Sequence, residues 1–223
     1  MRVWVTRDED EHGLLCSALR GAGQTPVLEP VVVRRVVNDC ALVIGQLQSD
    51  DWLVLTSPFA VRSVAEQQAQ KPNVAVVGDA SAAAAEARGF RVELVSPDGD
   101  AESLFAELRQ RLRTGKVCYA RSTRAVPPKS WGNVEIISPV LYETTPREFD
   151  RTVVERVDIV TVVSPSAVEA LDAVDLPFAS LGPTTTKALR KLKIKPAVQA
   201  KQRNFASLAA AIEGYERRKA KGE

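Results

Sequence analysis

The chain has 223 residues, of which 45% are hydrophobic and 26% are charged, and its formal net charge is +2. This composition is typical of a soluble globular protein with room for one large domain or two small ones. The low net charge does not favour nucleic-acid binding, and neither a signal peptide nor a membrane span is indicated, so we expect a cytoplasmic protein with no nucleic-acid or membrane partner.

Short apolar runs rich in β-branched residues alternate with helical patterns along the chain. In the first half, strands are predicted at 3–5, 27–33, 52–55, 74–77 and 91–95, and helices at 10–20, 60–68 and 80–88. In the second half, strands are predicted at 117–120, 134–137, 159–163, 178–181 and 196–198, and helices at 103–112, 167–171, 184–192 and 205–215. Near-continuous apolar strands between helices are typical of parallel sheets covered on both faces.

The sequence contains an internal repeat, which indicates how the strands and helices are grouped. Residues 51–61 align with 158–168, residues 76–81 with 180–185, and residues 101–104 with 205–208. Weaker matches link residues 5–7 with 119–121 and residues 30–31 with 139–140. Five matches in order are hard to attribute to chance, so the chain is expected to hold two copies of one α/β unit.

The distribution of strands predicts how these copies are arranged. We expect an α/β fold of two similar lobes, each a parallel sheet flanked by helices. One lobe would be discontinuous, formed by 1–34 and 147–223, and the other, 38–140, would be inserted into it. Crossover linkers at 34–38 and 141–146 would join the lobes, with the active site in the cleft between them.

Small, hydroxyl-bearing or basic residues follow the predicted strands. In open parallel sheets, ligands bind beyond the carboxyl ends of the strands, where helix N-termini favour carboxylates and phosphates. Instead of binding a ligand, the serine and threonine residues of a loop could simply cap the following helix. The arginines could likewise be solvated surface charges. Together the loops favour a polyanionic ligand, and the candidates are Thr6, Arg7, Ser57, Gly78, Ser81, Arg121, Ser164, Ser166, Gly182, Thr184 and Thr185.

Several familiar catalytic sites are missing from the sequence. The only histidine, His12, lies on a polar N-terminal helix and is expected at the surface, so the sequence does not predict a Ser-His-Asp triad. The three cysteines, Cys16, Cys40 and Cys118, have no metal-binding spacing and suit a reducing compartment. Tyr142, in the second crossover, is either packing between lobes or a phenol placed to donate a proton or hydrogen bond to a leaving hydroxyl.

These motifs resemble the uroporphyrinogen-III synthase family over nearly the whole chain. The similar segments include residues 5–7, the Pro26…Pro30 spacing, and residues 55–61, 77–82, 140–144, 164–168 and 181–185. Tyr142 matches the tyrosine between the lobes of that family. Phe59 stands where some members carry a basic residue, and Ser81 replaces a more usual threonine.

The resemblance implies a cofactor-free, metal-free lyase that cyclises the linear tetrapyrrole hydroxymethylbilane to uroporphyrinogen III. Tyr142 would assist loss of the hydroxyl, and the candidates at the strand ends would bind substrate carboxylates. We expect a monomer, with possible handover of substrate from the enzyme that forms hydroxymethylbilane. A non-enzymatic two-lobed binding module for a small anion is the main alternative. A flavodoxin-like domain is a third, although the paired aspartates of a phosphoacceptor site are missing.

Overall fold

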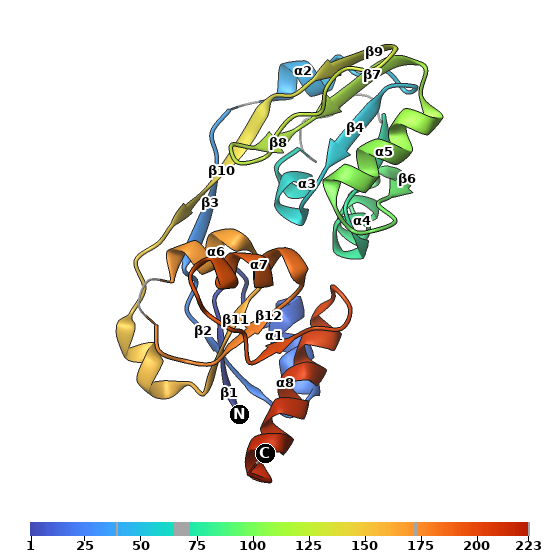
Figure 1. Ribbon diagram of the computed structural model, residues 1–223. Coiled ribbons are helices and arrows are strands. Elements are labelled where there is room, and N and C mark those ends of the chain that lie inside the picture. Colours follow the sequence, from blue (N-terminus) through green and yellow to red (C-terminus); the bar gives the residue numbers. More distant parts are fainter. Residues whose placement is uncertain (39, 65–71, 172–173, 223) are drawn as a thin grey trace. The chain divides into compact units, whose positions relative to one another are not determined.

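The computed structural model describes residues 1–38, 40–64, 72–171 and 174–222, and divides the chain into two compact units (Figure 1). Unit 1 consists of Met1–Val33 and Thr145–Glu223, and unit 2 of Arg34–Thr144. Part of the helix predicted at 60–68, residues 65–68, lies outside the described residues.

Unit 1 is built on a parallel five-stranded sheet with the order β13-β12-β11-β1-β2. Two helices, α1 and α8, pack against Val3 and Val5 on one face, while α6, α7 and the short 3-10 helix η1 pack with Trp4 on the other. Alternate residues of β1 therefore enter opposite cores, as the two-residue period of a strand requires. The elements are β1 (Arg2–Val5), α1 (Leu14–Gly21), β2 (Thr25–Leu28), η1 (Arg151–Arg156), β11 (Ile159–Val162), α6 (Pro165–Ala170), β12 (Phe178–Ser180), α7 (Pro183–Lys191), β13 (Val198–Gln199) and α8 (Phe205–Ala220).

Unit 2 is built on a second parallel five-stranded sheet, with the order β6-β5-β4-β7-β9. Helices α2, α3 and α4 pack on the face that carries Leu53 and Leu55, and α5 packs on the face that carries Trp52 and Val54. The elements are α2 (Ala41–Gly45), β4 (Trp52–Leu55), α3 (Pro58–Val64), β5 (Asn73–Val76), α4 (Asp79–Glu86), β6 (Arg91–Val95), α5 (Ala101–Arg111), β7 (Thr114–Tyr119) and β9 (Asn133–Ile137).

A third sheet, with the order β3-β10-β8, contains the two segments that pass from one unit to the other. Its strands are β3 (Val32–Val36), β10 (Val140–Pro146) and β8 (Arg121–Ser122), and the unit boundaries fall within β3 and β10. The expectation of one strand at 27–33 is wrong, because β2 ends at Leu28 and β3 begins at Val32. Pro30 lies in the gap, where the missing N–H and fixed φ of proline interrupt a strand.

The helix predicted at 10–20 is also shorter than expected, since α1 begins only at Leu14. The preceding polar residues form a loop in which the backbone N–H of His12 donates to Oδ1 of Asp10, at 2.8 Å. Aspartate side chains favour such local turns over helix interiors.

The two five-stranded sheets have equivalent strand orders, and the predicted α/β class with parallel, helix-flanked sheets is confirmed. The repeat pairs β4 with β11, β5 with β12 and β7 with β1, and each pair occupies the same position in its sheet. Unit 1 is therefore a circular permutant of unit 2, in which α8 comes last and β1 first. Across that junction, the Met1 amino group lies 2.6 Å from Oε1 of Glu216 on α8.

Candidate functional site

The candidate residues lie at the carboxyl edges of the two sheets. In unit 2 they follow β5, β4 and β7, which are neighbours, and in unit 1 they follow β12, β11 and β1, which are also neighbours. All strands of each sheet are parallel, so each unit gathers its own set of candidates at one edge.

In unit 2 the side chains of Tyr142 and Ser57 form a hydrogen bond. The phenol oxygen of Tyr142 lies 3.1 Å from Oγ of Ser57, which also accepts the backbone N–H of Ala60 at 3.2 Å. The Tyr142 ring packs against that of Phe59, with centroids 5.1 Å apart. The Tyr142 carbonyl accepts the N–H of Thr123, so β10 and its neighbouring chain hold the tyrosine from the other side. Only 6% of Tyr142 is exposed, and its phenol has a fixed hydrogen-bond partner.

The turn after β5 depends on a glycine. Gly78 precedes α4 with φ of 81°, a conformation that strongly favours glycine, although a Cβ there would meet no atom within 4 Å. Its carbonyl accepts the N–H of Ser81 at 3.1 Å. Ser81 is almost fully buried at the base of this turn. The first turn of α4 therefore contributes backbone N–H groups to the carboxyl edge of the sheet.

Arg121, after β7, is held by carbonyl groups. Its Nη1 donates to the carbonyls of Ser122, at 3.2 Å, and of Ala125, at 2.9 Å. Within the residues that the structure describes, no carboxylate pairs with this guanidinium. Since carbonyl groups carry no net charge, Arg121 keeps its positive charge for an incoming anion.

In unit 1 the loop after β11 joins two serines. Oγ of Ser164 lies 3.0 Å from Oγ of Ser166 and accepts the N–H of Ala167 at 3.3 Å. Ser164 is thus the N-cap of α6, which is the alternative that the sequence left open for each hydroxyl. Both serines are half-buried. Capping uses acceptor capacity of Ser164, and one hydroxyl proton is used between the two serines, which leaves the other hydroxyl proton for a ligand.

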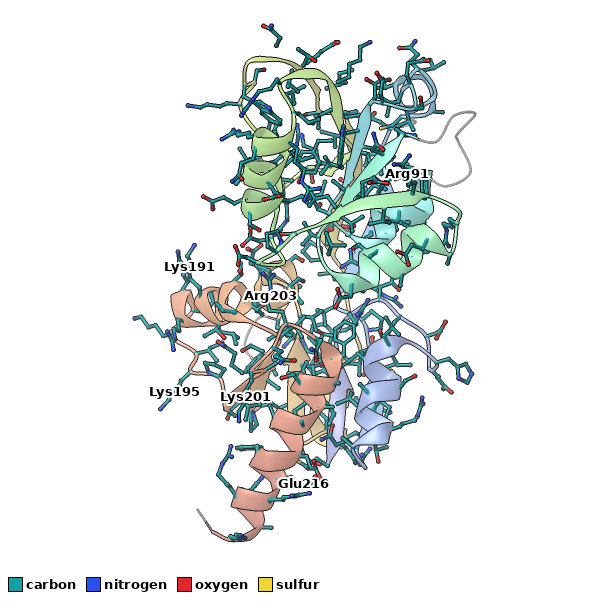
Figure 2. All side chains as sticks on the ribbon, turned by 90° about the vertical axis from the view of Figure 1, so that its right-hand side faces the viewer. Arg91, Lys191, Lys195, Lys201, Arg203 and Glu216 are labelled. Carbon is teal, nitrogen blue, oxygen red and sulfur yellow. The ribbon has the colours of Figure 1, made fainter. Side chains whose placement is uncertain are left out.

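The neighbouring loop begins α7 at Gly182, and Thr184 is exposed there while Thr185 is buried. Arg203 lies on the loop between β13 and α8 and is labelled in Figure 2. Its side chain packs close to Gly182. A Cβ at position 182 would come within 3.2 Å of the Arg203 Cγ, so any larger residue there would push the arginine side chain by a few tenths of an ångström. An exposed guanidinium beside a helix N-terminus makes this loop attractive to carboxylates.

Thr6 and Arg7 both have interaction partners within unit 1. The Thr6 hydroxyl is fully buried and donates to the carbonyl of Thr161 at 2.7 Å. The Nε of Arg7 lies 3.2 Å from Oε2 of Glu9, and its guanidinium carbon lies 4.6 Å from the centroid of the Phe205 ring. The charge of Arg7 is therefore paired inside the unit, in contrast to that of Arg121.

Glu9 is the carboxylate that occupies the start of α1. It accepts the backbone N–H of Cys16 at 2.8 Å and of Leu15 at 3.4 Å, and only 6% of its side chain is exposed. Gly13 leaves room for it, because a Cβ there would lie 2.5 Å from Cδ of Glu9. Unit 1 thus binds a carboxylate of its own between a helix N-terminus and Arg7.

The motifs of the sequence did not single out Glu9 or Arg203. The spacing of Glu9 and Gly13 gave no signal, because only the turn into α1 brings them together. Arg203 lies beside Gly182 because β12 and β13 pair in parallel, which the sequence did not specify in detail.

A surface hollow of about 520 Å³ lies elsewhere in unit 1, next to residues that start β1, β2 and β11. Its lining includes Arg2, Asp158 and Glu216. Two of its charged groups are already bound, since Asp158 accepts the N–H of Arg2 and Glu216 pairs with the terminal amine. This hollow is at the amino ends of the strands and contains none of the predicted site residues.

Residues 15–210 match the family model described as uroporphyrinogen-III synthase HemD. The chain is similar in fold to a selenomethionine mutant of uroporphyrinogen III synthase from the extremely thermophilic bacterium Thermus thermophilus, with 19% identity over 99% of each chain and a TM-score of 0.59. The wild-type enzyme of the same bacterium, in another crystal form, has 18% identity over 99% of each chain and a TM-score of 0.45. The comparison with curated proteins gives no match.

Proposed function

Because the chain belongs to the uroporphyrinogen-III synthase family, we propose that it converts hydroxymethylbilane to uroporphyrinogen III, with loss of water and inversion of the last pyrrole ring. The family match over residues 15–210 carries this proposal and makes the chain a cyclising lyase of tetrapyrrole biosynthesis. The two parallel, helix-flanked sheets support it through the fold.

The reaction requires the protein mainly to orient the linear tetrapyrrole. The electron-rich pyrrole expels its own hydroxyl, and the resulting electrophile closes without help to the wrong isomer. The enzyme must hold the chain so that the substituted carbon of the last ring attacks instead. Positioning of this kind supplies rate and selectivity without strong acid–base groups.

Tyr142 is the group that we assign to the departing hydroxyl. Since Oγ of Ser57 accepts the N–H of Ala60, its own proton is free to be donated to the Tyr142 oxygen. The phenol proton then points away from Ser57 and donates a hydrogen bond to the leaving oxygen. As the C–O bond breaks, the bonding electrons leave with the oxygen, which takes the phenol proton and departs as water. The pyrrole N–H then gives up its proton, which restores the phenol, so one water is lost overall.

The carboxylates of the substrate are assigned to the strand-end loops of each unit. The first backbone N–H groups of α4 and α7 suit this role, because the carbonyl groups of their own helices cannot accept them. Arg121 adds a positive charge that no described carboxylate neutralises. Thr6 and Arg7 are weaker candidates, since both have internal partners. The remaining candidates are Ser57, Gly78, Ser81, Ser164, Ser166, Gly182, Thr184 and Thr185.

The test is to supply freshly prepared hydroxymethylbilane and separate the product isomers by chromatography. The proposal expects the type III isomer to dominate, while a reaction with heat-inactivated protein gives the type I isomer. Type I product alone, together with measurable ligand binding, would support the two-lobed binding module instead. No observation in the structure favours that alternative.

We further propose that the protein works as a cytoplasmic monomer that receives its substrate from the enzyme that forms hydroxymethylbilane. Cys16, Cys40 and Cys118 are buried, and none of these three described cysteines forms a disulfide, as suits a reducing compartment. Among the described helices, none has the length and apolar character needed to cross a bilayer. Light scattering after size exclusion, with and without the upstream enzyme, tests both the monomer and the handover. A dimer at micromolar concentration would contradict the first.

A further inference from the structure

Unit 1 carries a strongly basic surface on α7 and on the loops that flank β13. Residues 187–203 contain seven lysines and arginines and no aspartate or glutamate. All seven are exposed, and among the described residues no carboxylate lies within ion-pair distance of them. The basic surface consists of Lys187, Arg190, Lys191, Lys193, Lys195, Lys201 and Arg203, four of which are labelled in Figure 2.

The fold does not require this charge, because the equivalent surface of unit 2 lacks it. The repeat aligns residues 187–203 with residues 83–99 without a gap. Residues 83–99 contain three acidic residues and two arginines, so their net charge has the opposite sign. One of these arginines, Arg91, is also paired with Glu93. The positive charge is therefore a property of unit 1 and not of the shared architecture.

The backbone of Lys193 adopts a conformation that is unfavourable for lysine. Its φ is 62°, and the equivalent residue of unit 2 is Gly89, with φ of 75°. Both end their helix in the same way, because the N–H groups of the next residues, Ile194 and Phe90, donate to helix carbonyls at 3.0 and 3.1 Å. Glycine is the usual residue at such a position, since it has no Cβ. Unit 1 thus has a lysine where the helix ending alone favours glycine.

The cations of α7 also repel one another. Lys187 and Lys191 are four residues apart in the helix, a spacing at which like charges destabilise it. In α8, by contrast, Arg217 pairs with Glu213 at the same spacing. The charges of the basic surface therefore stabilise neither the helix nor its ending, which indicates that they serve an anionic partner.

The position of the basic surface favours a small polyanion as that partner. Lys201 and Arg203 follow β13, at the carboxyl edge of the sheet. The Arg203 side chain packs close to Gly182, where α7 begins. The basic surface thus adjoins a strand-end loop that is assigned to substrate carboxylates. Several like charges on each partner give a long-range attraction that raises the rate of encounter.

We propose that the basic surface attracts the polycarboxylate substrate at long range and guides it to the strand-end loops of unit 1. This inference rests on the proposed function, which supplies the polyanionic substrate. The basic surface does not contact the reacting atoms. Its effect therefore belongs to the association rate and to kcat/KM, falls with ionic strength, and leaves kcat unchanged.

The experiment replaces three lysines by the residues that unit 2 has at the equivalent positions, in the triple variant Lys187→Ala, Lys191→Ala and Lys193→Gly. Stopped-flow mixing measures its association with uroporphyrin III, the oxidised form of the proposed product, which keeps the carboxylates. At an ionic strength of about 20 mM, we expect association about 3- to 10-fold slower than in the wild type. Near about 0.5 M, the difference should fall below about twofold, because salt screens exposed charges.

The same variant should keep its fold and its chemistry. Its Tm should equal or exceed that of the wild type, because a repulsive pair and a left-handed lysine are both removed. Its kcat for hydroxymethylbilane should change less than about twofold, since only the encounter is affected. Melting curves and saturating assays measure both quantities.

The matched control is the triple variant Arg218→Ala, Lys219→Ala and Lys221→Ala. It removes the same charge from exposed residues of unit 1, at the end of α8, where Lys219 lines the hollow at the amino ends of the strands. Its association rate should stay within about twofold of the wild type.

Equal slowing in the two triple variants would assign the effect to net charge and overturn the guiding role. Wild-type association of the Lys187/Lys191/Lys193 variant at low ionic strength would overturn it as well. If the wild-type protein forms only type I product, the proposed function itself fails. Type III product together with either of the first two results defeats this inference alone, so the two failures are distinct.

Discussion

The two units share one sheet order but use their strand ends differently. In unit 1 the chain after β1 turns through Gly13 into α1, and the Glu9 carboxylate binds both the start of that helix and Arg7. In unit 2 the chain after β7 reaches β9 with no helix in the described residues between them, and Arg121 is bound by carbonyl groups. One unit therefore neutralises its strand-end arginine internally, while the other leaves the charge available. The same sheet order can therefore carry an internally paired arginine at the strand ends of one unit and an arginine available to an anion at the strand ends of the other.

The largest effect is expected from Tyr142→Phe, which removes the phenol assigned to the leaving hydroxyl. Loss of a proton or hydrogen-bond donor at the leaving group should lower kcat by about 10- to 100-fold. Stopped assays with isomer analysis measure this, and circular dichroism should show an unchanged fold. Tyr215→Phe, on α8 of unit 1, is the matched control and should keep the wild-type kcat. A Tyr142→Phe enzyme with full activity removes this residue from the mechanism.

Gly13→Ala should break the internal carboxylate site of unit 1. The new Cβ would lie 2.5 Å from Cδ and 2.8 Å from Cβ of Glu9, so the loop itself must shift and the helix loses its bound carboxylate. We expect a loss of about 2 kcal/mol in the free energy of unfolding, from the overpacking and the lost cap. Gly21→Ala in the same helix meets no atom within 4 Å and should be neutral or slightly stabilising. Denaturant titrations of both variants decide between them.

Arg121→Gln and Arg7→Gln compare the two strand-end arginines directly. Removing Arg121 should raise KM about 5- to 10-fold, because a charge-assisted hydrogen bond to a substrate carboxylate is lost. Removing Arg7 should change KM less than about twofold and instead lower Tm, since its partner Glu9 loses a buried ion pair. Initial rates and melting curves on the same preparations separate the effects. Equal KM values for the two variants would contradict the assigned difference.

The smallest effects concern two of the three buried thiols, Cys16 in unit 1 and Cys118 in unit 2. Burial raises the pKa of Cys16 and of Cys118 to about 12, from 9.0. Both thiols are protonated at pH 8, so alkylation of the folded protein should be at least about 100-fold slower than in denaturant. Because the folded pKa is raised, the stability linked to each thiol is present below pH 9 and is lost as pH rises from 9 towards 12. Peptide mapping measures the alkylation rate of each thiol and therefore the opening of each unit separately. Equal alkylation rates in native and denatured protein would show that these thiols are not buried.

Much of the fold follows from local patterns. The central strands are buried on both faces, and β4 and β11 in particular are fully apolar runs apart from Thr161, so they were recognisable without tertiary information. The split of residues 27–33 into β2 and β3 was missed, because β-branched residues on both sides of Pro30 mask the change of sheet. Strand β10 was expected as a linker, since only its partners β3 and β8 make its backbone part of a sheet.

The candidate site was less accessible to sequence reasoning. Small polar residues after strands indicated the correct edge of each sheet, because parallel strands bring their carboxyl ends together. The sequence did not predict which of those residues have hydrogen-bond or ion-pair partners inside their own unit. Thr6 and Arg7 follow the same pattern as Arg121, yet their partners Thr161 and Glu9 come from packing and from a turn that the pattern does not specify.

The sequence by itself determined the α/β class, the repeat and the family resemblance, because strand and helix periods and the repeated order of motifs are local properties of the chain. Tertiary structure alone decided how each strand end is used. Contacts between residues far apart in sequence, such as Ser57 with Tyr142 and Gly182 with Arg203, depend on which strands become neighbours and on which loops have room for a side chain. Those distances are set by packing and not by any single segment.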